Sequence, residues 1–210
     1  MAGAETGAFT VVVDVNVLVS AQNASRAGRV ATISQRTLAY VTSGNVHGMP
    51  VQMAVSFKMI DAYRDVLLRH GYDADAIDAA AEALMDLVRH GPRVLDPYLV
   101  FGGTPDPSLR DVKDGGVLAT AFAASADVLV TDNLSDFLAA DCEAFNTSVG
   151  RRPDGQTRQL SCQIHTRANG RTLLVVHPVD FVHWMERRFD ISPAWIRSMF
   201  APARKPSRGS

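Results

Sequence analysis

Two short apolar runs, each followed directly by polar residues, dominate the hydrophobic pattern of the chain. Residues 9–13 contain three consecutive valines and are typical of a strand that is buried on both faces of a sheet. In residues 127–131 the β-branched Val and Thr residues alternate around Leu129, and they predict a second short, buried strand. Asp14 and Asn16 follow the first run, and Asp132 follows the second. The pattern therefore predicts acidic groups at the ends of two buried strands.

The remaining periodicity predicts an alternation of strands and helices. This alternation is typical of an α/β fold with a central, mostly parallel sheet and helices on both faces. A strand is predicted for residues 51–55, and Ser56 is placed to cap the helix that follows it. Further helices are predicted for residues 27–41, 73–90, 117–125 and 178–188, and for the segment that starts at Ser192-Pro193.

The last third of the chain predicts a β-hairpin and two helices. The hairpin strands are residues 160–166 and 172–177, and Asn169-Gly170 between them is a strong local signal for a hairpin turn. The polar residues 146–159 predict a mobile loop before the hairpin. We therefore divide the chain into a core over residues 1–145, an extension over residues 146–200 whose hairpin completes the sheet, and a disordered basic tail over residues 201–210.

Several acidic residues are expected to meet at one edge of the sheet. Asp114 lies in or just before the first turn of a predicted helix, where the positive helix end favours a carboxylate. In a parallel sheet the carboxyl ends of strands and the amino ends of some helices meet at the same edge. Asp14, Asp114 and either Asp132 or Asp136 would repel one another there unless a cation lies between them, and such oxygen ligands suit Mg²⁺ or Mn²⁺. The alternative is that they are separate surface carboxylates and helix caps.

Two segments carry a resemblance to a known family. They are DVNVLVSA near the amino end and KDGGVLATAFAASADVLVTDNLSDF further along the chain. Together they resemble the PIN domain, the metal-dependent nuclease module of VapC-type toxins and their relatives. The resemblance covers residues 9 to about 137, with a weaker echo at HPVDF near residue 177. The matching positions are Asp14 and Asn16 in the first motif, Asp114 at the start of the helix, and Thr131, Asn133, Asp136 and Phe137 in the last motif.

The resemblance implies a PIN-like three-layer fold and a role for each matching residue. Asp14, Asp114 and Asp136 are implied as the catalytic residues and as the strongest ligands of Mg²⁺ or Mn²⁺. Asp132 is an additional acid beside them, whose direction the sequence does not determine. The expected cofactor-binding residues are Asn16, which would fix the loop or a metal-bound water, Thr131, which would bond to Asp14 or to a water, and Asn133.

The sequence departs from the family pattern at one position. PIN domains usually carry a further acid on a helix in the middle of the chain, six residues after a Ser. Here Ser56 opens the helix SFKMIDAYRDVLLRHG, but the position expected to be Glu is Ala62. Asp61 is adjacent and Asp65 is three residues further, so either could replace the missing ligand after a small helix rotation. Neighbouring residues face about 100° apart on a helix, so the replacement is not automatic.

The resemblance implies a metal-dependent endoribonuclease that hydrolyses RNA phosphodiester bonds, with a further role as the toxin of a VapBC-like toxin–antitoxin pair. RNA is then the substrate, and an antitoxin protein and a homodimer are further partners to test. Ala62 favours the alternative of a PIN-fold RNA-binding or scaffold protein with weakened or no nuclease activity. A haloacid-dehalogenase-like phosphatase would need a second Asp where Asn16 stands, and no G-x-S-x-G or Walker motif is present.

Charge is divided unevenly along the chain, although the formal net charge is only −1. Residues 1–150 contain 10 Lys and Arg against 18 Asp and Glu, a net charge of −8, and residues 151–210 contain 11 against 4, a net charge of +7. An acidic core does not attract a polyanion, whereas a basic carboxyl-terminal part does. Two alternatives stay open, namely that the basic part is a solvated surface or that it docks on the acidic core.

The remaining features indicate an ordinary globular protein in a reducing compartment. Cys142 and Cys162 show no metal-ligand spacing, and none of the six histidines shows a HExxH-like spacing. The amino end lacks a basic region and contains Glu5, unlike a secretory signal. No apolar run approaches the roughly 20 residues that span a bilayer. We therefore expect a cytoplasmic location and no membrane partner.

Overall fold

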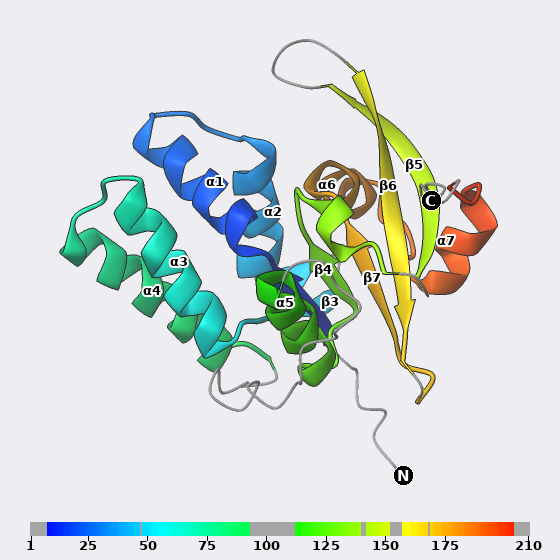
Figure 1. Ribbon diagram of the computed structural model, residues 1–210, viewed down its shortest axis with the longest axis horizontal. Coiled ribbons are helices and arrows are strands. Elements are labelled where there is room, and N and C mark those ends of the chain that lie inside the picture. The colour runs from blue at the N-terminus through cyan, green and yellow to red at the C-terminus, as the bar shows by residue number, and fades with distance from the viewer. Residues whose placement is uncertain are drawn as a thin grey trace.

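The computed structural model describes residues 8–46, 48–92, 112–139, 142–151, 157–167 and 169–203, without the side chains of residues 112–115, 151 and 158. This part of the chain is built around a seven-stranded mixed sheet with the strand order β2-β3-β1-β4-β7-β6-β5 (Figure 1). The strands are β1 (Phe9–Val13), β2 (Asn45–Val46), β3 (Met49–Ala54), β4 (Val128–Val130), β5 (Glu143–Arg151), β6 (Thr157–Thr166) and β7 (Thr172–Val176).

The sheet has a parallel centre and antiparallel margins. Strands β3, β1, β4 and β7 are parallel, whereas β2 pairs with β3, β6 with β7, and β5 with β6 in antiparallel fashion. The expected α/β fold, with a mostly parallel sheet and a hairpin that completes it, is therefore confirmed. The predicted hairpin is the β6–β7 pair, and the predicted strand over residues 51–55 is β3.

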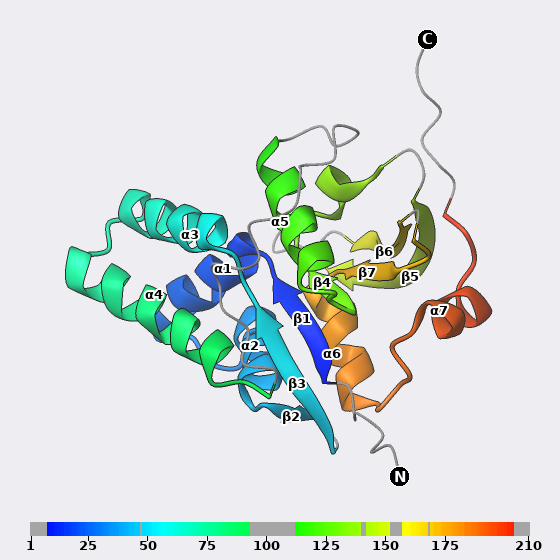
Figure 2. The same ribbon diagram turned by 90° about the horizontal axis from the view of Figure 1, so that it is seen from below.

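Helices connect the strands and cover the sheet. They are α1 (Val15–Arg26), α2 (Ile33–Thr42), α3 (Phe57–Arg69), α4 (Ala74–Arg89), α5 (Val112–Ala123), α6 (Pro178–Glu186) and α7 (Pro193–Met199), with a 3-10 helix, η2, over Leu134–Phe137. Figures 1 and 2 both show the α3–α4 pair at the end of the molecule opposite β5 and α7. Among the described helices none is both long and apolar enough to cross a membrane.

Alternate residues of each parallel strand pack into two different apolar layers. Val11 and Val13 of β1 belong to a layer with side chains of α1, α2, α6 and α7, and Val12 belongs to the opposite layer with side chains of α5 and with Phe137 of η2. All three valines are fully buried, as expected for a strand covered on both faces. Helices on both faces thus give the three-layer arrangement.

The predicted helix over residues 27–41 is wrong in its first part. The chain forms α1 directly after β1, turns at Gly28, and enters α2 only at Ile33. Gly28 and Ala31 both have positive φ, which ends the helical path between them. Thr32 then caps α2 in a capping box with Gln35, where each side chain accepts a hydrogen bond from the other residue's backbone N–H. The capping residues Thr32 and Gln35 therefore set the start of α2, whereas the apolar spacing alone placed the helix start too early in the chain.

The predicted loop over residues 146–159 is also wrong for its described part. Strand β5 continues to Arg151 and β6 begins at Thr157, so the two form a long antiparallel pair. The register shifts between Asn146 and Val149, which marks a β-bulge in β5. A bulge interrupts the alternation of polar and apolar residues along a strand. The sequence of β5 therefore lacks the regular pattern that predicts a strand.

The first residues of the expected basic tail are ordered against the sheet. The amide N–H of Ala203 donates to the carbonyl oxygen of Ala144 at 2.7 Å. The amide N–H of Asn146 donates to the carbonyl oxygen of Ala201 at 3.1 Å. Pro202 lies opposite Phe145 in an antiparallel bridge. The expectation of disorder from residue 201 therefore fails for residues 201–203, because they cover the outer edge of β5. Residues 204–210 lie outside the described part.

Candidate active site

The carboxyl ends of β1, β4 and β7 bring three polar residues side by side. Asp14 follows β1, Thr131 follows β4 and His177 follows β7. The amide N–H of Asp14 donates to the carbonyl oxygen of Val130 at 2.9 Å, and that of Thr131 donates to the carbonyl of Val176 at 3.0 Å. Because the sheet hydrogen bonding continues to these residues, their positions are fixed relative to one another.

Thr131 is the hydrogen-bonding centre of this edge. Its hydroxyl donates to the Oδ2 atom of Asp14 at 2.7 Å, which is one of the two bonds that the resemblance implied for it. The same Oγ1 atom accepts a hydrogen bond from Nδ2 of Asn16 at 3.3 Å and from the backbone N–H of Asn133 at 3.1 Å. A single hydroxyl thus orients the carboxylate after β1 and both asparagines of the motifs.

Asp14 is an acid in an environment that disfavours its charge. Only 6% of its surface is exposed, and burial raises the pKa of this carboxyl above its ordinary value. The hydrogen bond from Thr131 acts in the opposite direction, and the negative charge of Asp132 raises the pKa further. A cation beside Asp14 would reverse this balance, since it would stabilise both carboxylates.

Asp132 contacts a histidine that the sequence analysis did not place in the site. The Nε2 atom of His177 lies 3.5 Å from the Oδ1 atom of Asp132, and the imidazole is 7% exposed. Its Nδ1 atom accepts a hydrogen bond from the N–H of Val179, so His177 also caps the amino end of α6. The available signal was positional, because His177 follows β7 in the same way that Thr131 follows β4.

The last motif residues lie on η2, next to the strand ends. Nδ2 of Asn133 donates a hydrogen bond to the carboxylate of Asp136. The hydroxyl of Ser135 donates to Oδ1 of Asn133 at 2.9 Å. Phe137, the aromatic residue of the motif, is fully buried and holds η2 on the apolar layer of α5. The motif therefore consists of a hydrogen-bonded polar turn and one buried aromatic side chain, Phe137, that packs against the apolar layer of α5.

The other predicted ligands, Asp114 and Asp61, lie on helices α5 and α3. Asp114 belongs to the first turn of α5, as expected, but its side chain is not among those described. Asp61 is exposed on α3 and lies about 200° around the helix from Met59, whose side chain packs in the layer of α5. Ala62 lies only about 60° from Met59 and is therefore on the side of α3 nearer to α5. Asp61 thus lies on the side of α3 that faces away from α5, and its role as a metal ligand stays a prediction.

The described oxygen-bearing side chains at this edge suit a divalent cation, although they do not by themselves form a complete set of metal ligands. No group of three His, Cys, Asp or Glu residues close enough to hold a metal ion occurs in the described part of the chain. The Oδ1 atom of Asn16 is buried and has no hydrogen-bond partner among the described residues. An amide oxygen beside two carboxylates, Asp14 and Asp132, is the type of donor that Mg²⁺ and Mn²⁺ accept. These residues are therefore chemically compatible with a divalent cation.

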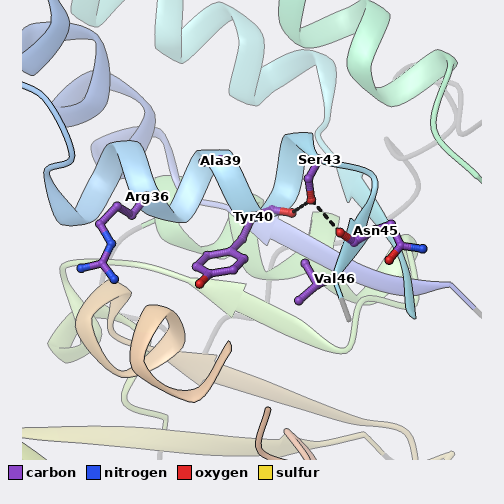
Figure 3. Close-up of a pocket in the computed structure, with 6 residues that line it drawn as sticks. All are labelled: Arg36, Ala39, Tyr40, Ser43, Asn45 and Val46. Atoms are coloured by element: carbon purple, nitrogen blue, oxygen red, sulfur yellow. Dashed lines mark hydrogen bonds between the residues drawn. The ribbon is translucent and has the colours of Figure 1, made fainter. Parts of the chain in front are cut away.

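A separate pocket lies away from this edge. It has a volume of about 450 Å³ and lies between α2 and β2 (Figure 3). Because β2 pairs with the amino-terminal end of β3, this pocket is near the sheet edge opposite Asp14. Arg36 in it forms an ion pair with Glu186 of α6. The lining residues are Arg36, Ala39, Tyr40, Ser43, Asn45 and Val46.

The fold and this edge define an α/β domain with an oxygen-rich, cation-compatible site at the carboxyl ends of its parallel strands. In a comparison with models of protein families, the PIN domain matches residues 10–135, more than half of the 210-residue chain. The chain therefore belongs to the PIN-domain family, whose members are mostly nucleases that use divalent metals. Comparisons with curated proteins and with solved structures gave no significant match.

Proposed function

We propose that the protein is a metal-dependent endoribonuclease that hydrolyses RNA phosphodiester bonds with Mg²⁺ or Mn²⁺. The observation that carries this proposal is the buried Asp14 carboxylate at the end of β1, oriented by Thr131 and adjacent to the charge of Asp132. Placing a buried acid beside a second acid costs free energy, which a bound cation would offset. Membership of the PIN-domain family supports the same reaction.

The proposed metal ligands are Asp14, Asp114 and Asp136, with Asp132 beside them and with Asn16, Thr131 and Asn133 as supporting residues. A bound divalent ion supplies Lewis acidity toward the scissile phosphate and lowers the pKa of water. Thr131 keeps the Asp14 carboxylate in one orientation, and Asn133 and Ser135 do the same for the turn that carries Asp136. His177 holds Asp132 from the side of β7.

A cleavage assay with matched variants tests this proposal. Wild-type protein is incubated with mixed single-stranded and structured RNA in Mn²⁺, in Mg²⁺ or in chelator. We expect cleavage only with metal, and a loss of about 10²-fold or more in Asp14→Asn, which keeps the side-chain shape but removes the charge. Asp86→Asn, an equal change at an exposed position on α4, is the control. Cleavage that survives chelator or Asp14→Asn would refute the proposal.

Asp61 remains a predicted metal ligand, and a variant decides its role. If a small rotation of α3 brings it into the site, Asp61→Asn lowers the cleavage rate together with the affinity for Mn²⁺. If it stays on the outer side of α3, where the structure shows it exposed, this variant cleaves RNA like wild type. The rate of Asp61→Asn relative to Asp86→Asn separates the two outcomes.

Ala62 favours a second candidate function, RNA binding without cleavage. The side of α3 nearest to α5 carries this alanine where the family usually has an acid, so one oxygen ligand is missing. In that case wild-type protein binds RNA in chelator as well as in metal and never cuts it. Ala62→Glu would then be expected to produce metal-dependent cleavage.

The role as a toxin remains a prediction that rests on the resemblance alone. It implies an antitoxin protein as an inhibitor and a homodimer as the assembled form. Co-expression with the product of a neighbouring gene, followed by measurement of RNA cleavage and of molecular mass, tests both.

A further inference from the structure

Strand β6 carries two polar side chains that are almost completely buried. Apolar and polar residues alternate over residues 162–165, which is the pattern of a strand with one face in water. In the structure, however, Gln163 is 2% exposed and His165 is 5% exposed. Their partners on β7, Val175 and Leu173, belong to the apolar layer of α5 and η2, so the two polar side chains share that side of the sheet. Burial there costs free energy unless the polar groups are hydrogen-bonded.

The side-chain amide of Gln163 connects β6 with η2. Its Nε2 atom donates a hydrogen bond to the carbonyl oxygen of Leu134, the first residue of η2, at 2.6 Å. Its Oε1 atom lies 3.1 Å from Nε2 of His165. Both ends of the amide thus have a hydrogen-bond partner, which is the usual condition for burying such a group.

The chemistry of the partners fixes the direction of both hydrogen bonds. A backbone carbonyl only accepts, so the NH₂ group of Gln163 faces Leu134. The amide oxygen then faces His165 and can only accept, so Nε2 of the imidazole carries a proton. His165 therefore holds the Gln163 amide in the one orientation that can bond to η2.

The carbonyl that Gln163 binds lies within the last motif of the candidate site. Leu134 lies between Asn133 and Asp136, whose side chains are hydrogen-bonded to each other. Phe137 holds the carboxyl end of η2 in the apolar layer of α5. Gln163 holds the amino end of the same short helix. The turn that carries Asp136 is therefore attached at both of its ends.

Strand β6 follows the part of the chain that the family model matches. The match ends at residue 135, whereas β6 spans Thr157–Thr166 and pairs with β5 at one margin of the sheet. The bond from Gln163 to Leu134 therefore joins the matched region to the antiparallel strand pair that comes after it.

We propose that Gln163, oriented by His165, is a positioning residue that holds η2 and thereby fixes Asp136 at the carboxyl edge of the sheet. The consequence for metal binding rests on the proposed function, in which Asp136 is a ligand. A ligand that is already held in place loses less conformational freedom when the ion binds, so this bond raises the affinity for Mn²⁺. Loss of a contact that supports a metal ligand typically lowers metal affinity by about 10- to 100-fold.

The test compares the same substitution at two buried glutamines. Gln163→Met keeps the approximate length of the side chain and removes the amide. Gln52→Met is the matched control, because Gln52 is fully buried on β3 and donates to the carbonyl oxygens of Met53 and Val88. Amide hydrogen exchange of residues 133–138 is measured by NMR in chelator. We expect Gln163→Met to accelerate exchange there by about tenfold and Gln52→Met to leave it unchanged.

Mn²⁺ affinity is the second readout, measured from the electron paramagnetic resonance signal of the free ion. Gln163→Met should bind Mn²⁺ about tenfold more weakly than wild type. Gln52→Met should bind Mn²⁺ like wild type even where its Tm is lower. His165→Leu removes the group that orients the amide and should change exchange and affinity in the same direction as Gln163→Met. His165→Gln keeps an N–H donor near the position of Nε2 and should restore both.

The outcomes separate the role of Gln163 from the proposed function. Wild-type exchange at η2 in Gln163→Met would overturn the role, whether or not the protein cleaves RNA. An equal acceleration in Gln52→Met would overturn it too, because the effect would then be a general loss of stability. Faster exchange with unchanged Mn²⁺ affinity would overturn the link to Asp136. If wild type binds no Mn²⁺, the proposed function fails, and the exchange rates still decide whether Gln163 holds η2.

Discussion

At the residue scale, the Thr131 hydroxyl links three motif residues that are distant in sequence. It donates to Asp14 and accepts from Asn16 and Asn133. Because a Thr hydroxyl has one hydrogen and two lone pairs, these three bonds use its full capacity. Residues that orient a metal ligand are typically almost as important for activity as the ligand itself.

Replacing Thr131 by Val tests this positioning role. The variant keeps the shape of the side chain but leaves the buried Asp14 without its hydroxyl donor. We expect RNA cleavage to fall by about 10- to 100-fold and the free energy of unfolding to fall by about 1–3 kcal/mol. Thr131→Ser retains the hydroxyl and should keep most of the activity. Full cleavage by Thr131→Val would contradict the role, and circular dichroism with denaturant titration would show whether a loss reflects unfolding.

Asp180 gives the protein a specific pH dependence of stability. Burial raises the pKa of this carboxyl above its ordinary value, although the hydrogen bonds from Ser148 and Thr147 act against the shift. The folded state therefore holds the proton to higher pH than the unfolded chain does. The contribution of Asp180 to stability falls as pH rises from about 4 through the raised pKa.

The variant Asp180→Asn isolates this contribution, because Asn keeps the shape and an acceptor oxygen but does not titrate. As pH rises above about 4, the ordinary pKa of an Asp, the free energy of unfolding of wild type should decline relative to that of Asp180→Asn until the raised pKa is passed. Denaturant midpoints measured at several pH values for both proteins give the comparison. Parallel profiles would show that Asp180 is not the source of the pH dependence.

One contact at the carboxyl edge of the sheet was foreseeable from the sequence, because Asp14 and Thr131 each follow a strand whose apolar pattern is clear. The resemblance implied a bond from Thr131 to Asp14 or to a water, and the structure shows the bond to Asp14. The contact of His177 with Asp132 was not predicted, since it depends on β7 lying next to β4 in the sheet. The order of strands in a sheet is not encoded in the local periodicity of any one of them.

At the element scale, buried strands and capped helices were predictable and the long antiparallel pair was not. Ser56 caps α3 as the sequence indicated, with a bond from the N–H group of Met59, and Asp73 caps α4 at the start of the predicted helix 73–90. Strand β5 was mistaken for a loop, because a bulge interrupts its alternation and its outer part is open on one face. Polar and glycine residues in such a strand look like those of a loop.

The segment at residues 201–203 has a predicted protective role for β5. It pairs with Ala144, Phe145 and Asn146 and so covers what would otherwise be an exposed strand edge. A chain ending at Phe200 should be less stable and should aggregate in a concentration-dependent way, whereas a chain ending at Ala203 should behave like the full chain. Light scattering and thermal unfolding of the two truncations measure this. Equal behaviour would mean that the edge needs no cover.

At the scale of the whole molecule, the described acids of the candidate site lie in the centre of the sheet. Asp14 and Asp132 follow the central strands β1 and β4, and the β5–β6 pair forms one margin. Some basic side chains take part in internal ion pairs, since Arg197 pairs with Glu143 and Arg36 with Glu186.

The proposed function requires the buried Asp14 carboxylate to be part of a divalent-cation site. Without metal, ionised Asp14 costs stability at neutral pH, because burial raises its pKa above that of the unfolded chain. Asp14→Asn should then be more stable than wild type in chelator. With Mn²⁺ in 100-fold excess over its Kd, wild type gains about 2.7 kcal/mol of stability.

The measurement that tests this claim most directly is the Tm of wild type and of Asp14→Asn, each in chelator and in saturating Mn²⁺, with Asp86→Asn as the control. The account predicts that Asp14→Asn has the higher Tm in chelator, that Mn²⁺ raises the Tm of wild type and of Asp86→Asn, and that Mn²⁺ leaves Asp14→Asn nearly unchanged. An equal increase of Tm with Mn²⁺ in all three proteins would contradict it.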